Sequence, residues 1–199
     1  MLKIGITGNI GSGKTTVTKL FELIGIPVFY ADDAAKSIMV TDEVLIAGIK
    51  QTFGDIAYFD DGTLNRKYIA GIVFNDEAQL AKLNALVHPA VFRAFDSWVK
   101  DVPADIPYVL KEAAVLFESS SYKMCDKAIM VTAPLEVRIN RVMRRDNITR
   151  EEVLSREARQ FTEQKKIQLA DYVIKNDESE LLIPQVLKLH EEFISSLGH

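Results

Sequence analysis

Residues 8–16 read GNIGSGKTT, with three glycines within six residues and then a lysine and two threonines. Glycine loses more conformational freedom on folding than any other residue, so a cluster of glycines needs a physical reason. Either the chain turns sharply here, or another group must come very close to the backbone. The sequence on either side helps to decide between these two explanations.

The flanking residues indicate a strand before the glycines and a helix after them. Residues 2–7, LKIGIT, have the pattern of a short buried strand. Apolar residues between Val17 and Ile24 then repeat at helical spacing, and Gly25 suits the position that ends a helix. The stretch therefore matches the P-loop pattern G-x-x-x-x-G-K-[ST], in the context that the pattern requires.

A P-loop binds nucleotide phosphates, because its glycines let successive N–H groups curl around phosphate oxygens at the positive end of a helix. Lys14 would reach the β- and γ-phosphates, and the Thr15 hydroxyl would ligate Mg²⁺. We therefore expect a bound nucleotide with Mg²⁺, and ATP as phosphoryl donor because the sequence lacks the patterns of a GTPase. The expected ATP-binding residues here are Gly8, Asn9, Ile10, Gly11, Ser12, Gly13, Lys14, Thr15 and Thr16. A glycine-rich turn without a ligand is the alternative. A dinucleotide fold is disfavoured, because the glycine spacing is not G-x-G-x-x-G.

Composition excludes several classes of protein. The 199 residues are 48% hydrophobic and 26% charged, which is typical of a soluble protein with one core or with one core and a small lobe. A net charge of −4 predicts no general attraction to nucleic acid or to anionic membranes. The single cysteine, Cys125, is expected as a small buried hydrophobe. With no membrane-span or signal-peptide pattern, we expect a cytoplasmic protein without nucleic-acid or membrane partners.

Strand patterns alternate with helical patterns along the chain. The predicted strands cover residues 2–7, 26–30, 106–113, 127–132 and 171–174. The predicted helices cover about 13–24, 33–40, 42–53, 66–73, 76–87, a stretch beginning at Pro89, 134–145, a stretch capped by Thr149 and Glu152, and 178–197. This alternation predicts an α/β fold, a parallel five-stranded sheet flanked by helices. Residues 42–100 show no strand pattern, so we expect an inserted helical lobe.

The remaining signals favour a small-molecule kinase. The sequence contains neither the N-K-x-D nor the D-x-x-G pattern of a GTPase. The second predicted strand ends in FYADD, so Asp32 and Asp33 follow the carboxyl end of a strand, where sites lie in open α/β sheets. One of them could accept the hydrogen bond of a substrate hydroxyl. The alternative is a helix-capping role.

Several charged residues have both a functional and an ordinary interpretation. Five arginines lie close together in the sequence, and three of them, Arg138, Arg141 and Arg145, share a helix face. They form either a phosphate-gripping lid or a solvated basic face; the other two are Arg144 and Arg150. Four further candidates are open between ligand binding and ordinary roles: Arg66 near a helix start, His88 held before Pro89 at a helix start, Glu112 at a strand end, and Glu118.

Taken in order, seven stretches resemble the dephospho-coenzyme A kinase family: TGNIGSGKTT, VFYADDAAK, DGTLNRKYIAGIVF, LNALVHPAV, EAAVLFES, RVMRRDNITREE and DYVIKND. The resemblance covers nearly the whole chain. It implies transfer of the γ-phosphate of ATP to the ribose 3′-hydroxyl of dephospho-CoA, the last step of coenzyme A synthesis. Tyr30 and Ala114 depart from the family pattern, in which Asp and Pro are usual.

The resemblance also implies roles for particular residues and segments. Asp32, Lys14 and Arg141 would be catalytic. Arg145 and Asn176 would join the ATP-binding residues, and Asp32, Arg66, His88 and Glu112 would bind the acceptor. The implied architecture is a P-loop core like that of nucleoside monophosphate kinases, over about 1–33, 104–136 and 168–199, with a helical acceptor-binding insertion over 34–103 and a lid over 137–167. A non-catalytic ATP-binding regulator and a nucleoside monophosphate kinase stay open as alternatives.

Overall fold

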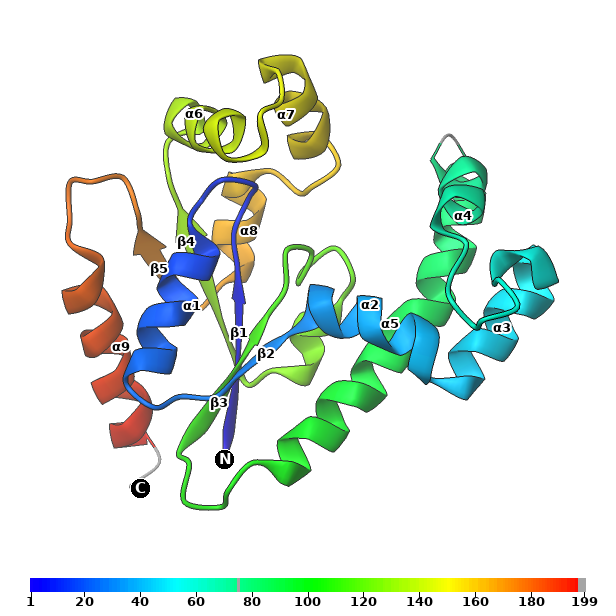
Figure 1. The fold of residues 1–199 in the computed structure, drawn as a ribbon. Coiled ribbons are helices and arrows are strands. Elements are labelled where there is room, and N and C mark those ends of the chain that lie inside the picture. Colours follow the sequence, from blue (N-terminus) through cyan, green and yellow to red (C-terminus); the bar gives the residue numbers. More distant parts are fainter. Residues whose placement is uncertain (75, 197–199) are drawn as a thin grey trace. The chain divides into compact units, whose positions relative to one another are not determined.

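The computed structural model describes residues 1–74 and 76–196, and the chain divides into two compact units. Unit 1 comprises Met1–Tyr30 together with the chain from Val102 onward, and unit 2 comprises Ala31–Asp101 (Figure 1). The expected end of the last helix at Leu197, and residues 197–199 of the expected core, lie outside the described residues.

Unit 1 is built on a parallel five-stranded sheet. Its strands are β1 (Leu2–Thr7), β2 (Val28–Tyr30), β3 (Tyr108–Glu112), β4 (Lys127–Thr132) and β5 (Tyr172–Lys175), in the order β2-β3-β1-β4-β5. The α/β prediction and all five predicted strands are confirmed. Because β1 lies in the middle, the loop after it emerges at the point where the strand order reverses, the usual ligand-binding position of such sheets.

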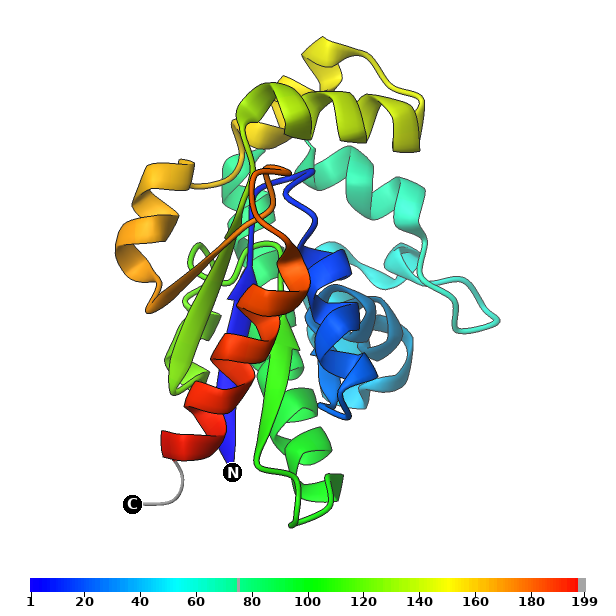
Figure 2. The same cartoon turned by 90° about the vertical axis from the view of Figure 1, so that its left-hand side faces the viewer.

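Alternating side chains of the strands cover the two faces of this sheet. Ile4 and Ile6 join the core under α1 (Lys14–Leu23) and α9 (Leu182–Ser196), two helices that lie side by side in Figures 1 and 2. Gly5 faces the other way, where a Cβ would meet Leu116 at 2.7 Å and Cys125 Sγ at 3.2 Å. Burial raises the pKa of the Cys125 thiol to about 11, so it stays protonated at neutral pH. On this face the segment 113–126, with η2 (Ser121–Met124), covers β1, while α8 (Glu163–Leu169) packs on β4.

Local signals explain several helix ends. Gly25 has φ +87° and its N–H donates to Glu22 O, while Ile26 N–H donates to Phe21 O, so α1 ends in a Schellman motif as the glycine predicted. The Thr149–Glu152 capping box opens α7 (Arg150–Glu157), also as predicted. Pro134 is the N-cap of α6 (Leu135–Asp146) rather than its first residue. Helix α8 was not predicted, because its seven residues are too few to show a clear period.

Unit 2 is helical, with α2 (Ala31–Thr41), α3 (Glu43–Phe53), η1 (Asp55–Ala57), α4 (Arg66–Val73) and α5 (Glu77–Asp101), and an isolated bridge that pairs Tyr58 with Leu64. The expectation of a helix beginning at Pro89 was wrong, since α5 runs through this residue. A proline inside a helix removes one hydrogen bond. Leu83 and Ala90, on either side of it, are buried in the same core, which favours one continuous helix.

Across residues 1–74 and 76–196, no helix combines the length and the apolar character needed to cross a membrane.

Candidate active site

The loop between β1 and α1 has the shape that its glycines predict. Gly11 and Gly13 have φ of +79° and +85°, in the left-handed region that favours glycine. A Cβ on Gly11 would also come within 2.5 Å of Arg138 O, and one on Gly8 within 2.7 Å of Val131 O. The glycines are therefore required both by backbone conformation and by close neighbours.

Lys14 is the first residue of α1 and forms an ion pair with Glu112, the last residue of β3. The parallel register of β1 and β3 sets Glu112 opposite Ile6, two residues before Gly8, and so brings the carboxylate beside the loop. Both side chains are mostly buried. The sequence did not decide whether the Glu112 carboxylate is buried. In the structure it is buried, and it pairs with Lys14.

Arg141 and Asn176 gather at the start of α1. Arg141 Nη1 donates to Asn176 O at 3.1 Å, and Asn176 Nδ2 donates to Ser12 O at 2.8 Å. A Cβ on Gly13 would lie 2.0 Å from Asn176 Nδ2 and 4.0 Å from Arg141 Nη1. A guanidinium thus lies beside the positive end of the α1 dipole, an arrangement that favours an anionic ligand.

Arg138, Arg141 and Arg145 lie on one continuous helix, so they share a face as their spacing predicts. This face is not a solvated basic face, because Arg138 is only 4% exposed and lies against the back of the loop. Arg145 is exposed, and its Nε and Nη2 donate to Asp146 at 2.6 and 3.0 Å. These hydrogen bonds raise the pKa of Arg145. Arg144 is exposed, and Arg150 pairs with Glu136.

Thr15 and Thr16, the next residues of α1, are exposed. A hydroxyl oxygen suits Mg²⁺, which in nucleotide sites takes most of its other ligands from phosphates and water. The donor chemistry at Thr15 therefore fits this ion. Among residues 1–74 and 76–196, no group of three or more His, Cys, Asp or Glu side chains could hold a metal ion.

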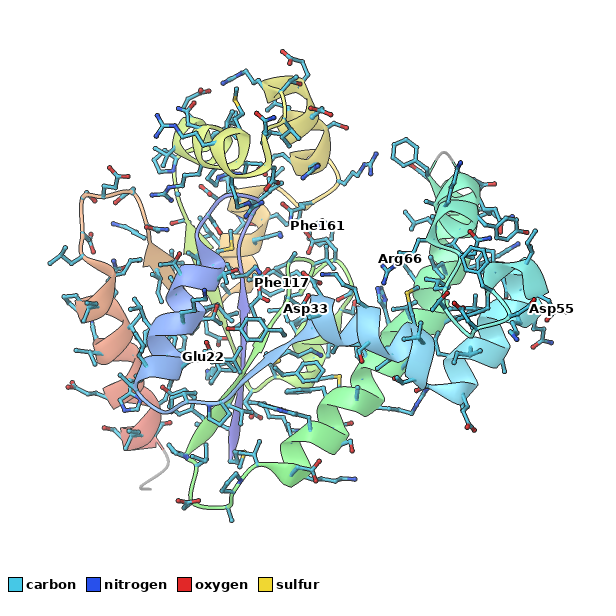
Figure 3. All side chains as sticks on the ribbon, in the orientation of Figure 1. Glu22, Asp33, Asp55, Arg66, Phe117 and Phe161 are labelled. Carbon is cyan, nitrogen blue, oxygen red and sulfur yellow. The ribbon has the colours of Figure 1, made fainter. Side chains whose placement is uncertain are left out.

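The acceptor-side candidates Asp32, Arg66 and His88 belong to unit 2. Helix α2 begins at Ala31, earlier than predicted, so Asp32 and Asp33 both lie in its first turn and neither is its N-cap. Both are exposed, and Asp33 pairs with Lys36 at 2.7 Å. Arg66, the first residue of α4, is exposed; Figure 3 labels Asp33 and Arg66. His88 is half-buried inside α5, not at a helix start, which corrects that expectation.

Sequence reasoning missed a second layer of residues behind the loop. Glu157 and Gln160 hydrogen-bond to Asn9 and Ile10, and Lys166 pairs with Glu118 at 3.0 Å. Lys166 is fully buried, and Glu118 is half-buried with this charged partner, so it is not a freely exposed carboxylate. The pairs are separated by 48 to 150 positions and follow no motif. The one usable signal was a carboxylate, Glu118, close after a buried strand, since such a group needs a partner.

The parallel sheet, the glycine loop after its central strand and the lysine that begins α1 define a P-loop nucleotide-binding protein. A dephospho-CoA kinase from Campylobacter jejuni has this fold: the alignment covers 98% of each chain at 23% identity, with a TM-score of 0.71.

The family follows from the sequence. The family model described as dephospho-CoA kinase matches residues 2–181. A Bacteroides fragilis relative named dephospho-CoA kinase is 36% identical over 188 residues, which cover 94% of this chain and 91% of the relative. The crystal structure of TT1252 from Thermus thermophilus is 37% identical, covers 96% of each chain and has a TM-score of 0.83. This chain belongs to the dephospho-CoA kinase family, as the motifs indicated. Membership assigns it ATP-dependent phosphorylation of dephospho-CoA, in coenzyme A biosynthesis.

Proposed function

We propose that ATP binds with its β- and γ-phosphates on the loop 8–13 and the first turn of α1, and that Lys14 and Arg141 neutralise the charge of the transferring phosphoryl group. The observation that carries this proposal is that a buried lysine, a guanidinium and the start of α1 meet around Gly13. Phosphoryl transfer relies on positioning and charge stabilisation more than on covalent chemistry, and these groups supply both. Asn176 would support the loop through Ser12 O.

Asp32 is the proposed catalytic carboxylate for the acceptor. It follows Tyr30, the last residue of β2, by two positions. A carboxylate can orient the ribose 3′-hydroxyl of dephospho-CoA and accept its proton. Arg66, His88 and Glu112 would bind the acceptor, with residues 34–103 as the acceptor-binding insertion of a core over 1–33, 104–136 and 168–199.

Glu112 would change partners during the reaction. In this structure its carboxylate neutralises Lys14. When phosphates bind, the lysine gains stronger anionic partners, and the carboxylate becomes available to a hydroxyl of the acceptor. One carboxylate would thus pair with Lys14 before ATP binds and later contribute to acceptor binding.

The segment 137–167 is the proposed lid, with Arg145 joining the ATP phosphates when it closes. Mg²⁺ would be held by the Thr15 hydroxyl and by phosphate oxygens, and when bound it would neutralise phosphate charge. We place the reaction in the cytoplasm, in keeping with a chain whose single cysteine offers no intrachain disulfide.

The test of phosphate binding is Lys14→Met, with Lys19→Met on the exposed side of the same helix as control. We expect turnover to fall by about 10²–10³-fold for Lys14→Met, the usual loss when one charge-stabilising group is removed. Thermal stabilisation by ATP should also fall, and the control should keep both. Lys14→Met leaves the buried Glu112 carboxylate without its partner, which by itself lowers folding stability. The same measurements are therefore made on the double variant Lys14→Met/Glu112→Gln, to separate lost phosphate binding from lost folding stability. Near-normal turnover of Lys14→Met would overturn the proposal.

A further inference from the structure

The segment Glu157–Phe161, which runs from the last residue of α7 into the connection to α8, holds the phosphate-binding loop from behind. Asn9 Nδ2 donates to Glu157 Oε1 at 2.9 Å and to Phe161 O at 3.1 Å. Ile10 N–H donates to Gln160 Oε1 at 2.9 Å. The Asn9 side chain is only 2% exposed. Two consecutive residues of the loop therefore direct donors to this segment.

Gln160 uses both ends of its amide. Its oxygen accepts from Ile10 N–H, and its Nε2 donates to Ala114 O at 3.2 Å. Ala114 lies two residues after Glu112, the partner of Lys14. The half-buried Gln160 amide thus joins Ile10 of the loop to the segment after β3. The last residue of β3 is Glu112, whose carboxylate lies beside Lys14.

The Glu157–Phe161 segment is itself anchored to the residues that follow β3. Phe161 N–H donates to Glu118 Oε1 at 2.7 Å, and the buried Lys166 ammonium contacts both Glu118 and Ala114 O. Phe161 and Phe117, which come from the two segments, are labelled in Figure 3. Hydrogen bonds to charged groups are stronger than neutral ones, and buried ion pairs are little screened by salt. The contacts of Glu118 and Lys166 therefore hold the Glu157–Phe161 segment strongly to the residues after β3.

Arg138 links this anchor to α6. Its Nη1 donates to Glu157 Oε2 at 2.7 Å and approaches Ile10 O at 3.4 Å, while its Nε donates to Ala133 O at 2.9 Å. The same helix carries Arg141, three residues further on, beside Gly13. Arg138 therefore joins the loop backbone and the Glu157–Phe161 segment to the helix that carries Arg141.

We propose that Glu157 and Gln160 are positioning residues for phosphoryl transfer: they fix the backbone of Asn9 and Ile10, so that the remaining loop N–H groups and Arg141 keep the geometry that the transferring phosphoryl group requires. A displacement of about 1 Å in a catalytic group can reduce rates by about 10²-fold. This inference rests on the proposed binding of ATP phosphates by the loop, and it assigns neither residue a contact with ATP.

The test compares Gln160→Leu, which removes both hydrogen bonds at similar size, with Gln160→Glu, which keeps the acceptor for Ile10 N–H and loses the donor to Ala114 O. Gln185→Leu is the matched control, because the Gln185 amide also bonds at both ends, to Lys175 N–H and Lys175 O. We expect kcat to fall by about 10–10²-fold in Gln160→Leu and by less than tenfold in Gln160→Glu, with KM for dephospho-CoA within about twofold. Gln185→Leu should keep the wild-type kcat.

Two further measurements distinguish the positioning role of Gln160 from a loss of folding stability and from a failure of the proposed function. Thermal unfolding identifies a merely structural effect, which would lower the melting temperature and leave kcat per folded molecule unchanged. If Gln160→Leu does not fold, Gln160→Glu decides, with a several-fold loss of kcat expected. Lys14→Met is assayed alongside: if it is inactive while both Gln160 variants keep the wild-type kcat, this inference fails and the proposed function stands. If Lys14→Met is active, the proposed function itself fails.

Discussion

Lys14 and Glu112 show how a single ion pair can prepare a site for its ligand. A buried ammonium without a partner would be costly, and Glu112 neutralises it in this structure. Phosphate oxygens offer the lysine several negative charges in place of one. At the scale of one residue, the proposed binding of ATP would therefore be an exchange of anionic partners at Lys14.

Substitutions of the two adjacent aspartates, Asp32 and Asp33, are expected to affect activity very differently. Asp32→Asn keeps the shape of the side chain but removes its charge and basicity, so kcat should fall by about 10²–10⁴-fold, the span of a positioned general base. ATP affinity should hardly change, because the loop holds the nucleotide.

Asp33→Asn is the control for this substitution. Its carboxylate is exposed and pairs with Lys36 in a surface contact, which contributes little to stability. We expect near-normal activity. Steady-state kinetics of the two variants, measured side by side, provide the check, and a crippled Asp33→Asn with an active Asp32→Asn would reverse the assignment.

Some features at the residue scale could be predicted from the sequence, and others could not. Gly11 and Gly13 follow from a motif whose physics is local, and so does the Thr149–Glu152 capping box. Gln160 and Lys166 act on residues 150 and 48 positions away, respectively. Nothing in the local sequence of either residue encodes its partner, because only the folded chain brings the two together.

At the scale of elements, two of the arginines on α6 have different surroundings. Arg141 is beside Gly13 and Asn176, whereas Arg145 is bound to Asp146. We expect Arg141→Ala to lower kcat by about 10²-fold, with a smaller effect on ATP affinity in the open state. Arg145→Ala should also lower kcat more than affinity, if closure of the lid transfers its guanidinium from Asp146 to phosphate.

Arg144→Ala, an exposed residue on the same helix, is the control for both arginines. Single-turnover rates and equilibrium ATP binding separate the two effects. Wild-type kcat in both the Arg141 and the Arg145 variant would show that these side chains serve only as surface charge.

Helix boundaries show where local rules fail at this scale. Helices with an amphipathic period or a cap, such as α4 and α7, began where the sequence predicted. The break expected at Pro89 did not occur, because the buried residues on both sides favour a continuous α5. Burial of a long helix can outweigh the preference of one residue, and this balance cannot be read from residues 88–90 alone.

At the scale of the whole molecule, alternation of strands and helices predicted the parallel sheet but not its strand order. The order β2-β3-β1-β4-β5 decides that Glu112 ends a strand next to β1 and therefore meets Lys14. The family resemblance supplied the acceptor, which neither the periodicity nor the sheet indicates. The acceptor is thus the feature of the function that a direct assay should address.

ADP release with a panel of acceptors tests the central claim most directly. The panel contains dephospho-CoA, AMP, UMP and CMP, with ATP and Mg²⁺ constant. A site that orients an acceptor hydroxyl should discriminate strongly against acceptors that present it differently, so kcat/KM for dephospho-CoA should exceed that for each monophosphate by at least about 10²-fold. Coenzyme A itself, already phosphorylated at the 3′ position, should release no ADP. Faster turnover of any nucleoside monophosphate than of dephospho-CoA would contradict the assigned function.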